Sequence, residues 1–196
     1  MKCIYVDSTN ANMCVIAING DKVEYKTSGG VSLKHNDILL PYLDEVLYKV
    51  GMDIANVEYV ACSVGAGSFT GIRLGVTTCN GIAFASGAKR IAMNTFSPFA
   101  YNSKGKLLVL IDARHGNYYG AEYLDGEEIR LGNYTQNEVD SYQGKTIIID
   151  GQHNIEDIIA RIKEKISKND FTNMLVPMYL KASQAEREIN ANSKSC

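Results

Sequence analysis

The residues of this chain that could do chemistry begin with one glycine-rich run, Gly65-Ala66-Gly67-Ser68-Phe69-Thr70-Gly71. It lies between an apolar stretch and a predicted helix, and free N–H groups and the helix dipole make such a junction able to bind anions. The run lacks the GxxxxGK[ST] pattern of a phosphate loop. We therefore give more weight to a structural role, in which Ser68 or Thr70 caps the helix and the glycines permit a tight turn.

Two carboxylates are the best candidates for catalysis. Asp7 and Asp112 each follow a predicted strand, at strand ends where actin-like ATPases keep carboxylates that steer a metal ion. The alternative is that both side chains cap turns, as Asp commonly does. The residue pattern alone leaves both interpretations open.

The sequence shows neither the ligand spacing of a metal site nor the motif of an activated nucleophile. His35, His115 and His153 lie far apart, without the HxxxH spacing that places two imidazoles on one helix face. Ser68 does not lie in a GxSxG elbow, so a serine-hydrolase triad is not indicated. The sequence predicts no metal site, no bound cofactor and no catalytic residue.

Composition narrows the possible partners. The 196 residues carry a formal net charge of −2, whereas a domain that grips nucleic acid by itself usually has a clustered basic excess. Any contact with RNA is therefore expected to be indirect. The five cysteines form no CxxC pair, as in reduced core thiols. Neither a signal peptide nor an apolar run of membrane length is recognisable, so we predict a cytoplasmic protein.

Hydrophobic patterning predicts an α/β fold. The elements expected in the first half are strands at 3–6, 13–18 and 22–27, a helix near 39–50, a strand at 57–64, a helix at 72–86, a strand at 90–93 and a short helix at 95–101. Asn36 is a plausible N-cap and Gly51 the C-terminal stop of the first helix. A meander followed by crossovers requires a mixed, partly parallel sheet.

The polar stretch 102–105 is the predicted boundary between two lobes. A new apolar strand begins after it, at 107–111, and Asp125-Gly126 is expected to close a hairpin. A strand at 146–149 and a helix with an isoleucine face at 155–166 complete the second half. We predict a first lobe of residues 1–102, a compact second lobe of 103–189 and a disordered tail of 190–196.

The helix after the glycine-rich run is unusual, because no charged residue follows Arg73 until Lys89. An ordinary surface helix keeps a charged face. This helix is either packed between layers of its own fold or docked on another protein, with close backbone approach at its glycines. The predicted partner interface takes residues from it and from the preceding helix: Leu39, Leu43, Ile72, Arg73, Val76, Thr77 and Asn80.

The run from Gly65 to Gly75 closely resembles the GPGSFTGxRxG signature of the TsaB (YeaZ) family. The motif residues are Gly65, Gly67, Ser68, Phe69, Thr70, Gly71, Arg73 and Gly75. Similar stretches occur at 4–9, 35–41, 111–114 and 177–181, so the resemblance extends from about Lys2 to Ala185. Ala66 stands where the signature has proline. Residues 7–11 lack the glycine that lets phosphate approach the first hairpin in nucleotide-binding members of the superfamily.

This resemblance implies an actin/Hsp70/sugar-kinase-like (RNase H-like) fold, with two related lobes of mixed β-sheets flanked by helices. It also implies a part in making N6-threonylcarbamoyladenosine in tRNAs that read codons beginning with A. The chain would be a non-catalytic subunit that binds and activates a TsaD-like transferase, joined by a TsaE-like ATPase, and would form a homodimer when alone. Two other hypotheses remain: an ATP-dependent enzyme using Asp7 and Asp112, and a glycoprotease-like peptidase.

Overall fold

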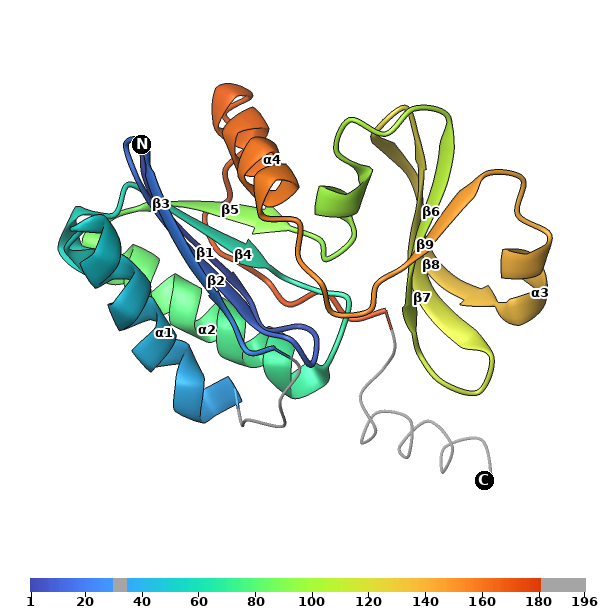
Figure 1. Ribbon diagram of the computed structural model, residues 1–196, viewed down its shortest axis with the longest axis horizontal. Coiled ribbons are helices and arrows are strands. Elements are labelled where there is room, and N and C mark those ends of the chain that lie inside the picture. Colours follow the sequence, from blue (N-terminus) through green and yellow to red (C-terminus); the bar gives the residue numbers. More distant parts are fainter. Residues whose placement is uncertain (30–34, 181–196) are drawn as a thin grey trace.

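Two mixed β-sheets form the framework of the computed structural model, which describes residues 1–29 and 35–180 (Figure 1). The first sheet contains β1 (Lys2–Asp7), β2 (Cys14–Asn19), β3 (Lys22–Thr27), β4 (Tyr59–Ser63) and β5 (Lys89–Met93). The second contains β6 (Lys106–Asp112), β7 (Asn117–Leu124), β8 (Glu127–Thr135) and β9 (Lys145–Ile148).

The two sheets share one topology. Their strand orders are β3-β2-β1-β4-β5 and β8-β7-β6-β9. In each, three antiparallel strands form a meander, and a later strand then pairs in parallel with the first, β4 with β1 and β9 with β6. The predicted relation between the lobes and the mixed character of the sheets are therefore confirmed.

Helices cover both faces of the first sheet (Figure 1). On one face lie α1 (His35–Val50) and α2 (Phe69–Ser86), and on the other lies α4 (Ile155–Ser167). Successive side chains of a strand point to opposite faces, so Ile4 packs in the cluster with α1 and α2, whereas Tyr5 packs in the cluster with α4. The first sheet is thus buried on both sides.

The limits of α1 and α2 differ slightly from the predicted ones. Helix α1 already includes His35, so Asn36 lies within its first turn and is not its N-cap. Gly51, with a φ of 65°, follows the last helical residue as predicted. Helix α2 begins three residues earlier than its apolar periodicity suggests, because Ser68 caps it there.

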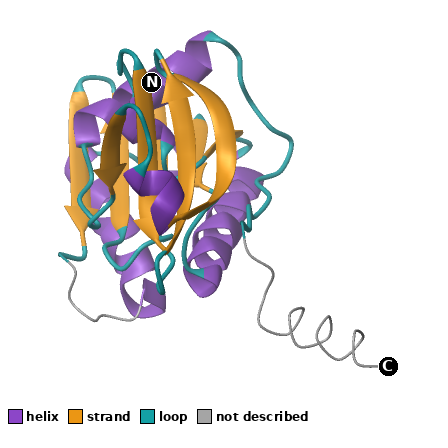
Figure 2. Cartoon of the chain, turned by 90° about the vertical axis from the view of Figure 1, so that its right-hand side faces the viewer, coloured by secondary structure: helices purple, strands orange, loops and turns teal. Residues whose placement is uncertain are grey.

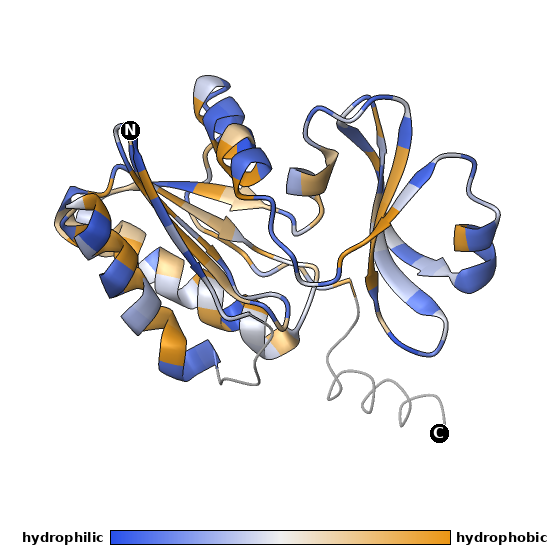
Figure 3. Cartoon of the chain, viewed as in Figure 1, coloured by the Kyte–Doolittle hydropathy of each residue, from blue (hydrophilic) through white to orange (hydrophobic). Residues whose placement is uncertain are grey.

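Less helical structure covers the second sheet than the first. Viewed from the second lobe, its strands lie behind one short helix, α3 (Gln136–Asp140), which the sequence analysis missed (Figure 2). A capping box between Thr135 and Glu138 defines the start of this helix. Hydrophobic residues concentrate on the central strand β6, whereas most of β8 is hydrophilic and exposed (Figure 3). The two 3₁₀ turns are η1 (Ile54–Asn56) and η2 (Ser97–Ala100).

The predicted lobe boundary is wrong for the last part of the described chain. Helix α4 packs on the first sheet through Ile158 and Ile162. Beyond it, the Phe171 ring stacks on Tyr59, and the Thr172 N–H donates to the Arg90 carbonyl at 3.0 Å. The physical reason is that α1 and α2 leave one apolar face of the first sheet uncovered, and the isoleucine stripe of α4 fills it. The predicted tail of 190–196 lies outside the described residues.

Candidate functional site

The glycine motif joins β4 to α2. The Ser68 hydroxyl accepts a hydrogen bond from the Gly71 N–H at 3.3 Å, which confirms one of the two predicted caps. The Ser68 N–H is itself used, because it donates to the Thr9 carbonyl at 2.7 Å. The motif therefore binds the turn between β1 and β2.

Two glycines of the motif are needed for this contact. A Cβ atom on Gly67 would lie 2.4 Å from the Thr9 carbonyl oxygen, and one on Gly71 would lie 1.9 Å from that of Ser8. Both distances are far below a van der Waals contact. The Ser8 hydroxyl completes the junction by donating to the Gly71 carbonyl at 2.7 Å.

The other two glycines meet further parts of the chain. A Cβ atom on Gly65 would lie 2.2 Å from the Met178 carbonyl oxygen, next to the Met178 N–H that donates to the Val64 carbonyl at 2.7 Å. A Cβ atom on Gly75 would lie 2.6 Å from the Ser8 hydroxyl oxygen. Backbone and hydroxyl groups of the chain itself thus fill the space that a Cβ atom would need at all four motif glycines.

The aromatic and basic residues of the motif hold the last described segment. Tyr179 stacks on Phe69 with ring centroids 4.7 Å apart, and the Arg73 guanidinium lies 3.9 Å from the Phe69 centroid. Arg73 Nε also donates to the Tyr179 hydroxyl at 3.0 Å. Thr70 is exposed. The sequence analysis did not foresee that Arg73 binds Tyr179, although both lie in stretches that carry the family resemblance.

Most of the predicted partner-interface residues cannot contact a partner. Leu39, Leu43, Ile72 and Val76 are at most 4% exposed and belong to the core between the helices and the first sheet. The prediction is wrong for these four, because the apolar stripes of both helices face the sheet. The face assigned to a partner is the protein's own core.

The remaining three predicted interface residues differ in exposure. Asn80 is half-buried, and its side chain forms two hydrogen bonds with the backbone of Leu175. It donates to the Leu175 carbonyl at 2.9 Å and accepts from the Leu175 N–H at 3.0 Å. Arg73 is exposed but engaged with Tyr179, and Thr77 is exposed. Of the seven predicted interface residues, Arg73 and Thr77 are therefore the two that are exposed, as the interface prediction requires.

Large apolar side chains do point outward elsewhere on the same two helices. Leu40 and Tyr48 of α1 are 58% and 86% exposed, and Phe84 of α2 is 85% exposed. We call the surface formed by Leu40, Tyr48, Thr77 and Phe84 the α1–α2 face. The signal that could have identified it is that Leu40 and Tyr48 are apolar but fall outside the stripe centred on Leu39, Leu43, Val46 and Val50.

The two candidate carboxylates occupy equivalent ends of β1 and β6 but differ in environment. Asp7 is 3% exposed, and its Oδ1 accepts hydrogen bonds from the Thr9 N–H at 2.9 Å and the Thr9 hydroxyl at 2.6 Å. Asp112 is exposed and accepts from the Arg114 N–H at 2.7 Å. In both positions the carboxylate caps a turn, the role expected of Asp there.

Two histidines bind the turn after β1. His35 Nε2 lies 3.1 Å from the Ala11 carbonyl oxygen, and His153 Nε2 lies 2.7 Å from that of Asn12. His115 is exposed in the turn between β6 and β7. Within the ranges 1–29 and 35–180, no three His, Cys, Asp or Glu side chains gather as a metal site would require.

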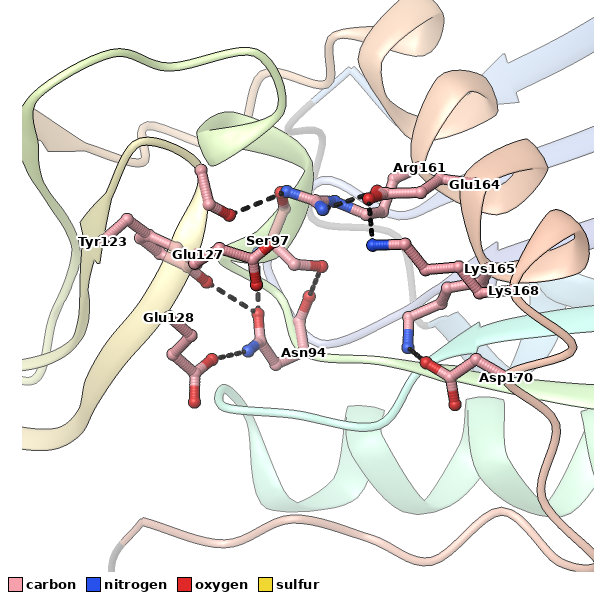
Figure 4. Close-up of a pocket in the computed structure, with 11 residues that line it drawn as sticks. Asn94, Ser97, Tyr123, Glu127, Glu128, Arg161, Glu164, Lys165, Lys168 and Asp170 are labelled. Carbon is pink, nitrogen blue, oxygen red and sulfur yellow. Dashed lines mark hydrogen bonds and ion pairs between the residues drawn. The ribbon is translucent and has the colours of Figure 1, made fainter.

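A pocket of about 230 Å³ opens between the lobes, where α4 approaches η2 and the turn between β7 and β8 (Figure 4). Its cations are neutralised internally. The shortest ion-pair distances are 2.6 Å for Arg161 with Glu164, 2.8 Å for Lys168 with Glu164 and 2.6 Å for Lys165 with Asp170. The Arg161 guanidinium further donates to the Ser97 carbonyl at 3.3 Å. Polar contacts around the pocket therefore link the two lobes.

Two lobes of this topology define an actin/Hsp70/sugar-kinase-like protein. The structure superposes on that of an uncharacterized protein with similarity to peptidase YEAZ from Pseudomonas aeruginosa with a TM-score of 0.76, at 18% identity, over 92% of this chain and 99% of that one. At this identity the likeness shows the fold alone. It confirms the predicted fold class. None of the helices in the described part of the chain has the length and apolar character needed to cross a membrane.

Residues 15–174 match the family model described as TsaD: tRNA N6-adenosine threonylcarbamoyltransferase, and the chain belongs to this family. Among curated relatives it is 29% identical over 121 residues to the tRNA threonylcarbamoyladenosine biosynthesis protein TsaB of Buchnera aphidicola subsp. Schizaphis graminum, covering 59% of this chain. It is 28% identical over 132 residues to TsaB of Escherichia coli (strain K12), covering 65% of this chain. The resemblance to TsaB (YeaZ) proteins is thereby confirmed. The chain spans 58% and 57% of the lengths of these two relatives.

Proposed function

We propose that this chain is a non-catalytic partner subunit in the synthesis of N6-threonylcarbamoyladenosine in tRNAs that read codons beginning with A. It binds and activates a TsaD-like transferase in the cytoplasm, and a TsaE-like ATPase joins the complex. The names of the TsaB relatives support the pathway. The observation that carries the non-catalytic role is the packing of Gly67 and Gly71 against the carbonyls of Thr9 and Ser8.

That packing bears on catalysis because a phosphate-binding loop needs free backbone N–H groups and open space in front of its glycines. Here the Ser68 N–H is bonded to Thr9, and the space before Gly71 is filled by the Ser8 carbonyl. Asp7, the carboxylate at the same edge, is already bonded twice by Thr9. A nucleotide would have to displace all of these contacts.

The α1–α2 face is the proposed docking surface for the transferase. Its three large apolar side chains, Leu40, Tyr48 and Phe84, are exposed. They belong to two helices that lie side by side (Figure 1), and exposed apolar surface favours protein association. A second copy of the chain would use the same face, so the homodimer and the transferase complex would exclude one another. The formal net charge of −2 supports only indirect contact with tRNA.

The test is reconstitution of tRNA threonylcarbamoylation from the TsaD-like, TsaE-like and adenylate-forming proteins of the same host. We expect modification to require this chain, and to be lost with the double variant Tyr48→Asp/Phe84→Asp, which should also fail to co-elute with the transferase. Ile129→Asp, a similar change at an exposed residue of β8, should behave like the wild type. Full activity without the chain would refute the proposal.

The competing enzyme hypothesis has its own measurement. An ATP-dependent enzyme using Asp7 and Asp112 should bind Mg-ATP in the micromolar range, about −8 kcal/mol. For the partner subunit, calorimetric titration of the isolated chain with Mg-ATP should give only the heat of dilution. Micromolar binding that is lost in Asp7→Asn would favour the enzyme.

A further inference from the structure

A second hollow, distinct from the interlobe pocket, lies where η2, β6, β9 and the start of α4 meet. Its volume is about 520 Å³. We call it the η2–α4 groove. Its walls bring together two aromatic rings, Phe99 and Tyr101, and two lysines, Lys104 and Lys145. Phe99, Tyr101 and Lys104 lie close together in the sequence, and the fold brings Lys145 of β9 beside them.

The charges of the groove differ from those of the interlobe pocket. Lys104 and Lys145 are both exposed, and neither forms an ion pair with any residue in the part of the chain that the structure describes. In the interlobe pocket every cation has a carboxylate within 3 Å, Lys165 with Asp170 among them. The groove therefore has two ammonium groups available for an anion.

The aromatic rings are accessible and held in position. Phe99 and Tyr101 are both half-buried, and both line the groove. The Arg161 guanidinium lies 5.3 Å from the Tyr101 centroid and is itself bonded to the Ser97 carbonyl. A ring fixed in this way loses little conformational entropy when a flat ligand stacks on it.

We propose that the η2–α4 groove binds a nucleotide monophosphate unit, either as a free nucleotide or within an RNA strand. Its phosphate lies between Lys104 and Lys145, and its base stacks on Phe99 or Tyr101. Aromatic platforms beside a basic track are the means by which proteins hold single nucleotides without reading their sequence. A single nucleotide unit needs only the local cationic site that the two lysines form, whereas gripping a whole tRNA needs a clustered basic excess, which the net charge of −2 does not suggest.

One carboxylate also lines the groove. Asp157 Oδ2 accepts a hydrogen bond from Asn154 Nδ2 at 2.6 Å. This carboxylate would repel a phosphate but can accept a hydrogen bond from a ribose hydroxyl. The ligand is therefore expected to place its phosphate beside the two lysines and its ribose beside Asp157.

The groove is independent of the proposed docking surface. Helix α4 covers the face of the first sheet opposite to α1 and α2 (Figure 1). A partner on the α1–α2 face leaves the groove open, and the two proposals can therefore fail separately.

The experiment follows amide chemical shifts of the full chain during titration with AMP, with adenosine, with inorganic phosphate and with a short oligoadenylate RNA. We expect AMP to shift signals from the residues of the groove. Tyr101→Ala should weaken binding about tenfold, because base stacking on an aromatic ring contributes ~1–3 kcal/mol. Lys104→Glu/Lys145→Glu should weaken it at least as much.

The matched control is Lys22→Glu/Lys163→Glu, which makes the same charge change at two exposed lysines outside the groove. This variant should bind AMP as the wild type does. If the RNA binds at least tenfold more tightly than AMP, and salt weakens this binding, the natural ligand is a nucleotide unit of an RNA strand. Equal affinities for the RNA and AMP would identify the free nucleotide as the ligand. The proposal is overturned if neither AMP nor the RNA changes the amide chemical shifts of the groove residues. It is also overturned if inorganic phosphate binds as tightly as AMP, or if the groove variants keep wild-type affinity for AMP.

Discussion

The two lobes have the same strand topology but very different packing. The first sheet is covered by α1 and α2 on one face and by α4 on the other, and Asp7 at the end of its first strand is buried. Within the described residues, the second sheet carries only the short α3 over its outer face, and Asp112 in the equivalent position is exposed. Helix α4, which follows the second sheet in the chain, packs on the first. The comparison shows that related topology does not ensure equal burial, since the burial of each sheet depends on the layers that cover it.

The largest predicted difference between the lobes concerns buried charge. Val76→Arg places an unpaired charge in the first-lobe core, where Val76 is 4% exposed, and we expect a loss of at least about 4 kcal/mol in the free energy of unfolding. Val139→Arg in the second lobe should cost about 1 kcal/mol or less, because this half-buried side chain can reach water. Urea denaturation followed by circular dichroism measures both. A stable, folded Val76→Arg protein would contradict the assignment of this face to the core.

The second prediction compares glycines. In Gly71→Ala the new methyl group meets the Ser8 carbonyl, which is backbone and cannot turn aside, so we expect a loss of about 3 kcal/mol or more. In Gly120→Ala of β7 the nearest atom, at 2.5 Å, is a methyl group of the Leu110 side chain, which can move, and the loss should be smaller. Gly81→Ala is the control on α2: nothing lies within 4 Å of its Cβ position, and helix propensity should stabilise it by up to ~1 kcal/mol. Equal losses of stability in Gly71→Ala and Gly120→Ala would contradict the expected difference between a backbone contact and a side-chain contact.

A third prediction uses the buried thiols, because residues 103–180 contain no cysteine. Burial raises the pKa of Cys3 to about 12 and that of Cys14 further, and contact with the Cys79 thiol together with burial raises the pKa of Cys62. Above pH 9 the unfolded chain loses these protons while the folded chain keeps them, so stability falls as the pH rises. Between pH 7.5 and 9.5 three such thiols should together lower the free energy of unfolding by about 4 kcal/mol.

The control for this pH dependence is Cys14→Ala. One of the three thiols is then missing, so the loss between the two pH values should shrink by about a third, whatever the variant's stability at pH 7.5. A pH dependence that is the same in wild type and variant would show that other groups cause it. Alkylation under native conditions in a Cys196→Ser background should also be slow, because a neutral thiol is a poor nucleophile.

The smallest predicted difference is between the two turn carboxylates. Asp7→Asn weakens two hydrogen bonds from Thr9 in a buried site and should cost about 1 kcal/mol, whereas Asp112→Asn in an exposed turn should change stability by less than about 0.5 kcal/mol. Both variants should retain partner-dependent tRNA modification if the chain is not catalytic. A loss of activity of two orders of magnitude in a folded variant would instead indicate catalysis by the carboxylate.

Local signals in the sequence determined most of the elements. The period-2 and period-3.6 apolar patterns predicted nearly every strand and long helix, and Asp125-Gly126 predicted a hairpin whose two turn residues both have positive φ. The short α3 was missed because five residues are too few to show a period. The glycine motif was the most specific part of the family resemblance, and in the structure Gly65, Gly67 and Gly71 lie against backbone carbonyls and Gly75 against the Ser8 hydroxyl.

Only the tertiary structure decided which side of each pattern faces the core. An apolar stripe does not say whether a sheet or a partner covers it, so Leu39, Leu43, Ile72 and Val76 could be assigned to an interface until the first sheet was seen to bury them. The same holds for α4, whose isoleucine face fits either sheet by composition. Contacts between distant segments, such as Arg73 with Tyr179, leave no local periodicity in the sequence. They depend on where folding brings the segments together.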